Sequence, residues 1–138
     1  MASAKELIKN KKNFIKFSPE GIHWGYHAHY IEEENGLISW YIPSFDIYYT
    51  STTKEEGGQI GYDATKAFFE FWLKRQSFRK LVNKILHLGY KTENFQQLKN
   101  LLERSNINAN LIGAYHKLPN SFKDSISQEH TGELRAAV

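Results

Sequence analysis

A chain of 138 residues that is 41% hydrophobic and 14% aromatic suits one packed domain and excludes a globally disordered protein. The chain contains no cysteine, which excludes disulfides and thiolate metal sites, and no apolar run near the ~20 residues that a membrane span needs. Its formal net charge is +3. We therefore expect a cytoplasmic protein that does not enter a membrane.

The first segments are short. Ser3-Ala4-Lys5-Glu6 has the spacing of a helix capping box and predicts a helix that ends near Lys12. Residues 14–17 follow as a strand or a covering segment, and Ser18-Pro19-Glu20-Gly21 is typical of a turn.

Residues 22–31, 37–42 and 45–51 predict three antiparallel strands, with Pro43 at the corner between the second and the third. The turn between the first two strands sets their faces. A three-residue loop of Glu34, Asn35 and Gly36 pairs even-numbered residues with even-numbered ones, whereas a two-residue Asn35-Gly36 loop would mix the faces. We favour the three-residue loop because it separates aromatic from histidine positions. The predicted inner face carries Trp24, Tyr26, Ala28, Tyr30, Ile38, Trp40 and Ile42, and the predicted outer face carries His23, His27, His29, Ile31, Leu37, Ser39 and Tyr41.

A flexible lead-in over residues 54–61 is expected to precede a helix over residues 63–76, with Asp63 as its N-cap. The predicted buried stripe of this helix is Ala64, Ala67, Phe68, Phe71 and Trp72, widened by Phe69 and Leu73. This stripe places Trp72 opposite Trp40 in the core.

The second half of the chain predicts helices over residues 78–88, which stop at Gly89, and over residues 95–102. Residues 111–118 fit a short helix or a strand. We therefore expect an α+β domain over residues 1–118, in which a sheet of three or four mostly antiparallel strands and the first helix (residues 14–76) are followed by a helical extension (residues 77–118). Residues 119–138 are expected to form a flexible polar tail.

The outer face of the sheet is the first candidate site. A row of histidines could hold a metal, but His23 lies ~13 Å from His27 on an extended strand, so solvent-facing polar residues are the favoured interpretation. The apolar residues among them predict a homodimer or partner contact. The candidate partner-binding residues are His27, His29, Ile31, Leu37 and Tyr41. No motif joins a nucleophile to a base, so we expect neither an enzyme nor a cofactor.

Residues 66–91 hold seven basic residues against one acid. Such a run fits either a solvated helix face or a surface for nucleic acid or an acidic partner. The candidate residues, taken as one helical run, are Lys74, Arg75, Arg79, Lys80 and Lys84.

The order of strand, acidic Asn-Gly turn, strand with proline, strand and helix resembles the HicB-type antitoxin domain, a partial RNase H-like fold. The resemblance rests on residues 26–31, 33–36, 38–43, 45–50 and the helical Ala64–Phe69 segment. It implies a non-catalytic, dimeric protein that blocks a small ribonuclease toxin, and often an additional DNA-binding segment. The alternatives are a nucleic-acid-binding regulator that uses the basic helix face and a small inhibitor of a phage or host enzyme.

Overall fold

The computed structural model describes residues 13–75, 77–103, 108–113 and 118–135. The helix expected between Ser3 and Lys12 lies outside the described residues. The strands are β1 (Phe14–Ser18), β2 (Gly21–Glu32), β3 (Ile38–Ile42), β4 (Ile47–Ser51), β5 (Lys91–Thr92), β6 (Ala109–Ile112) and β7 (Ile126–Arg135). The helices are α2 (Lys54–Arg75), α3 (Phe78–His87), α4 (Phe95–Glu103) and the 3-10 turn η1 (Asn120–Phe122).

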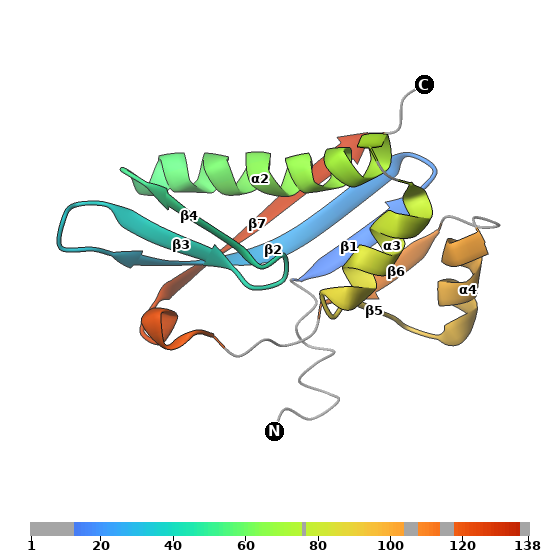
Figure 1. The fold of residues 1–138 in the computed structure, drawn as a ribbon. Coiled ribbons are helices and arrows are strands. Elements are labelled where there is room, and N and C mark those ends of the chain that lie inside the picture. Colours follow the sequence, from blue (N-terminus) through green and yellow to red (C-terminus); the bar gives the residue numbers. More distant parts are fainter. Residues whose placement is uncertain (1–12, 76, 104–107, 114–117, 136–138) are drawn as a thin grey trace.

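The described strands form one antiparallel sheet around β2 (Figure 1). The strand β7 pairs with β2 along its length, from Gly21↔Arg135 to Tyr30↔Ile126. Residues 21–25 of β2 also pair with β1, and residues 29–32 also pair with β3. Because a strand has only two edges, β1 and β3 must lie one after the other on the edge opposite β7. Between them, Asn13 Oδ1 accepts a hydrogen bond of 3.0 Å from the backbone N–H of His27.

The β2–β3 hairpin has the predicted register. Tyr30 pairs with Trp40, and the backbone N–H of Glu33 donates to the carbonyl of Leu37 at 2.8 Å. Gly36 has a φ of 85°, the left-handed conformation that the three-residue loop requires. The seven residues of the predicted inner face are all buried. The prediction of the turn and of the inner face is therefore confirmed.

The helix α2 covers this inner face (Figure 1), but it begins earlier and is rotated relative to the prediction. It starts at Lys54, where the backbone N–H of Glu56 donates to Thr53 Oγ1 at 3.1 Å, so the predicted flexible lead-in is helical and Asp63 is not the N-cap. The glycines have a packing role here. A Cβ on Gly57 would lie 2.2 Å from the Trp40 ring, and one on Gly61 would lie 2.6 Å from Tyr49 Oη.

The buried seam of α2 continues through Thr65 and Phe69, which are both fully buried. Phe71, expected in the core, is exposed, and Trp72 is only partly buried. Trp40 packs at Gly57, fifteen residues before Trp72 and about 22 Å away along a helix that rises 1.5 Å per residue. The predicted Trp40–Trp72 contact is therefore wrong. The side of α2 that meets the aromatic sheet therefore begins with the small residues Gly57, Gly61 and Thr65 and continues with Phe69.

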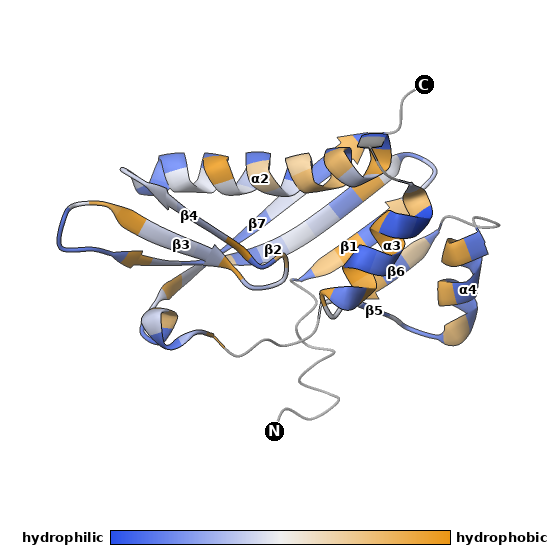
Figure 2. Cartoon of the chain, viewed as in Figure 1, coloured by the Kyte–Doolittle hydropathy of each residue, from blue (hydrophilic) through white to orange (hydrophobic). Residues whose placement is uncertain are grey.

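The helix α3 agrees with the predicted periodicity, whereas α4 has the predicted range but buries Leu101 and leaves Phe95 exposed. In α3 the side chains of Leu81, Val82 and Ile85 are buried, and hydrophobic and hydrophilic residues alternate along it (Figure 2). Gly89, with a φ of 104°, follows the end of this helix as predicted.

Two predictions are wrong: that the C-terminal half is helical and that the sheet has only three or four strands. Within the described residues the sheet has seven strands, the α-helices lie within residues 54–103, and residues 109–112 and 126–135 are strands. The segment expected to be a flexible tail contains β7. Its inward residues include only two large apolar ones, Ile126 and Leu134, so alternation in the sequence is weak. Gly132 instead makes room for the Trp24 ring, and His130 stacks on Tyr26 at 5.5 Å.

Within the residues that the structure describes, none of the helices has both the length and the apolar character needed to cross a membrane.

Candidate partner-binding surfaces

The sheet face opposite α2, which we call the histidine face, combines the odd-numbered residues of β2, β3 and β7 with Tyr48 of β4. Its members include His23, His27, His29, Ile31, Leu37, Ser39, Tyr41, Ser127, Glu129, Thr131 and Glu133. All five candidate partner-binding residues lie on this face. The structure therefore places them on one side of the sheet, as the register predicted.

Glutamates of β7 lie beside the histidines. Glu133 pairs with His23 across the two strands, and His27 Nε2 lies 3.8 Å from Glu129 Oε1. The pKa of His29 is lowered, first by burial and then by the neighbouring His27. Within the described residues, no group of three or more histidine, aspartate or glutamate side chains is arranged to hold a metal ion.

The segment that leads into β7 covers part of the histidine face. Phe122 lies on Tyr41, with ring centroids 5.7 Å apart, and Ser125 Oγ lies 3.3 Å from His29 Nδ1. The Tyr41 hydroxyl donates to Asp46 Oδ1 at 3.1 Å. Burial and this carboxylate raise the pKa of Tyr41 well above its usual range. Tyr41 is thus buried within the fold, whereas Leu37 at the hairpin end stays exposed.

Tyr48 is the exposed aromatic residue of this face, and the sequence interpretation did not single it out. Its ring stacks on Tyr41 with centroids 4.2 Å apart and lies 6.1 Å from Phe122, while 57% of the residue remains accessible. A continuation of the hairpin register past the Pro43 turn would have found it, because β3 and β4 pair Tyr41 with Tyr48.

The basic candidates do not lie on one helical run. Lys74 and Arg75 are the last residues of α2, and Lys74 Nζ lies 3.7 Å from Glu70 Oε2. A separate helix, α3, follows, and Ser77 is its N-cap. The side chain of Arg75 lies outside the description. In α3, Arg79 and Lys80 are exposed and Lys84 is half-buried. The break between the helices means that the predicted adjacency of Arg75 and Arg79 on one helix is wrong.

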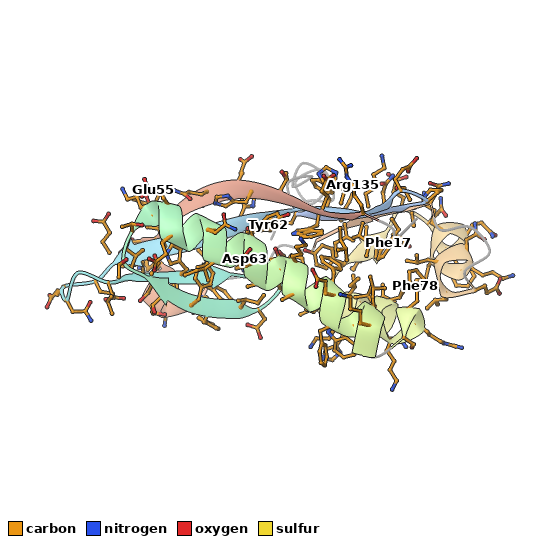
Figure 3. The ribbon with its side chains drawn as sticks, turned by 90° about the horizontal axis from the view of Figure 1, so that it is seen from above. Phe17, Glu55, Tyr62, Asp63, Phe78 and Arg135 are labelled. Carbon is orange, nitrogen blue, oxygen red and sulfur yellow. The ribbon has the colours of Figure 1, made fainter. Side chains whose placement is uncertain are left out.

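Acidic and basic residues are concentrated in different parts of the chain. Residues 32–63 contain seven carboxylates and one lysine, which reverses the balance of residues 66–91. Figure 3 looks down on α2 and shows Glu55 at the start of this helix, with Phe78, the first residue of α3, beyond its other end. Acids at the start of a helix and bases at its end also complement the helix dipole, so part of this separation stabilises α2 itself.

Comparisons with protein-family models, with curated proteins and with solved structures give no match for this chain.

Proposed function

We propose that this protein is a non-enzymatic binding protein of the toxin-neutralising type, which holds a small basic ribonuclease on its histidine face. The observation that carries the proposal is Tyr48, an exposed aromatic side chain stacked at 4.2 Å on a buried ring. Tyrosine is enriched among the residues that dominate binding energy at protein interfaces. A ring whose orientation is already determined loses little conformational entropy when a partner covers it.

The surroundings of Tyr48 favour a basic partner. Asp46 precedes it in the β3–β4 turn, and the histidine face that it shares also carries Glu129 and Glu133 of β7. Acidic surfaces attract basic partners at long range and raise their association rates. The resemblance to HicB-type antitoxins supports the same class of partner.

The test is co-expression with the product of a neighbouring reading frame that encodes a small basic ribonuclease. The wild-type chain should restore growth and co-purify with the ribonuclease. Tyr48→Ala should weaken the complex about tenfold or more, because an interface anchor contributes roughly 2 kcal/mol or more. Phe95→Ala is the matched control, since it truncates another exposed aromatic side chain, which lies on α4. Failure of the wild-type chain to neutralise or bind the ribonuclease would refute the proposal.

The alternative is a nucleic-acid-binding regulator, and the exposure of Arg79 and Lys80 in the first turn of α3 favours it. Binding to duplex DNA should then weaken steeply with salt, because each phosphate contact releases counterions. Arg79→Glu with Lys80→Glu should abolish this binding, while Tyr48→Ala should not affect it. The two variants therefore separate the two functions.

A further inference from the structure

The outer edge of β7 is the longest strand edge that the described sheet leaves without a partner. The strand has ten residues and pairs with β2 only, whereas the terminal strands β4 and β5 have five and two residues. The β2–β7 register is continuous from end to end, so no bulge bends β7 away. The strand also contains no proline. Natural sheets shorten, bend or block such edges, because an open edge is a template for another strand.

The hydrogen-bonding direction of β7 follows from two contacts of β2. The backbone N–H groups of His27 and Glu33 point to Asn13 and to β3, on the edge opposite β7. Backbone groups alternate between the two edges of a strand, so the even-numbered residues of β2 point to β7. Their partners in β7 are also even-numbered. The odd-numbered residues from Ser127 to Arg135 therefore turn their N–H and C=O groups outward.

We infer that this edge binds the same edge of a second copy, so that two β7 strands pair in antiparallel orientation about a twofold axis. We identify the binding partner as a second copy because the side chains of β7 complement those of an antiparallel β7. Centring the pair on His130 places Ile126 opposite Leu134 and Ser127 opposite Glu133, with Glu129 opposite Thr131. This register spans residues 126–134 and opposes no like charges.

Neighbouring registers fit less well. Centring on Thr131 would place Glu129 opposite Glu133 twice, and centring on Glu129 would place two glutamates opposite each other; like charges directly opposite destabilise a strand pair. Centring on Gly132 pairs Glu129 with Arg135 but leaves Ile126 uncovered. Ile126 is 58% accessible in the single chain, and in the register centred on His130 Leu134 of the second copy lies opposite it.

The arrangement goes beyond the proposed function. A twofold axis perpendicular to the sheet keeps the two copies of α2 on one side and joins the two histidine faces into one continuous surface on the other. The Tyr48 side chains remain accessible at its outer parts, because β4 lies beyond β3 and away from β7.

The first experiment measures the association of the purified full chain by sedimentation velocity over a concentration series. The wild-type chain should be a dimer. Thr131→Glu should raise the dissociation constant about tenfold, because it places like charges opposite each other across the twofold axis. Thr131→Lys is the matched control at the same exposed position, and it should lower the constant. A wild-type monomer throughout the series, or equal effects of the two variants, would overturn the inference.

The second experiment tests the register and uses the absence of cysteine from the chain. The double variant Ser127→Cys/Glu133→Cys should form an intermolecular disulfide under mild oxidation, because opposed residues in the proposed register lie within disulfide range. Within one chain the two positions are six residues apart on a strand, roughly 20 Å, which prevents an internal bond. Ser127→Cys alone should give far less cross-linked dimer. Absence of cross-linking by the double variant in a dimeric sample would overturn the register. Neutralisation of a ribonuclease depends on Tyr48 rather than on these positions, so failure of either proposal leaves the other testable.

Discussion

The indole nitrogen of Trp24 donates a hydrogen bond of 2.9 Å to Thr65 Oγ1, and this contact joins the central strand β2 to the middle of α2. Both residues are fully buried. The Thr65 hydroxyl lies 3.0 Å from the carbonyl of Gly61 one turn earlier and donates to it. This arrangement gives the buried indole N–H an acceptor and also fixes the rotation of α2 over the sheet.

Thr65→Val should lower the free energy of unfolding by about 1–3 kcal/mol, because it keeps the shape of the side chain but leaves the Trp24 N–H without an acceptor. Chemical denaturation would measure the loss. Thr65→Ser keeps the hydroxyl and should retain more stability than Thr65→Val. A Val variant as stable as the wild-type chain would show that the hydrogen bond contributes nothing.

Gly57→Ala and Gly58→Ala should differ although the two glycines are adjacent in α2. A Cβ at Gly57 would overlap the Trp40 ring, and such overpacking costs about 1–3 kcal/mol. A Cβ at Gly58 would lie 3.4 Å from the His130 ring, and alanine favours a helix by about 0.5–1 kcal/mol over glycine. Thermal unfolding of both variants would test the contrast. Equal destabilisation would contradict the close approach of α2 to Trp40.

Phe69 rather than Trp72 should be the dominant aromatic residue of α2. Its ring is fully buried and lies 4.6 Å from Trp24, so Phe69→Ala should cost about 3–5 kcal/mol. Phe71→Ala, at the exposed neighbouring position, should change stability by only about 0.5 kcal/mol. If Phe71→Ala were the more destabilising variant in denaturant titrations, the assigned rotation of α2 would be wrong.

Stability should fall as the pH falls below about 6.5. The pKa values of His29 and His130 are lowered from 6.5, mainly because burial disfavours the charged imidazole. The unfolded chain therefore binds more protons than the folded chain just below pH 6.5, and the stabilisation present above this pH is lost as the pH falls through the folded pKa values. The double variant His29→Gln/His130→Gln should show a flatter profile of unfolding free energy between pH 5 and 7. An unchanged profile would exclude these two residues as its source.

Proline substitutions should separate the two edges of β7. Gln128→Pro removes an N–H that points to β2 and should lower Tm by about 5 °C or more, because a ladder hydrogen bond is lost. Thr131→Pro removes an N–H that points outward, so its effect on Tm should be clearly smaller. Circular dichroism melts would compare the variants. The reverse order would contradict the assigned direction of the backbone groups.

The sequence by itself determined the features that depend on near neighbours. The Gly36 turn left two pairings of β2 with β3, and the separation of aromatic from histidine positions favoured the one that assigns Trp24, Tyr26 and Trp40 to the core. The helical period of residues 78–88 and the stop at Gly89 were readable for the same reason. In these cases the interactions that decide the conformation lie within a few residues of each other.

Only the tertiary structure decided the role of the weakly patterned segments. Gly57 and Gly61 look like flexible residues until Trp40 and Tyr49 are known to lie against them. The strand β7 has little hydrophobic alternation because the rings of β2 fill the space beside it, and its partner lies about a hundred residues away in the chain. Phe122 likewise covers Tyr41 and leaves Tyr48 exposed through contacts between distant segments. These contacts join residues far apart in the chain, and the local pattern of a sequence carries no record of which distant side chain fills a given space.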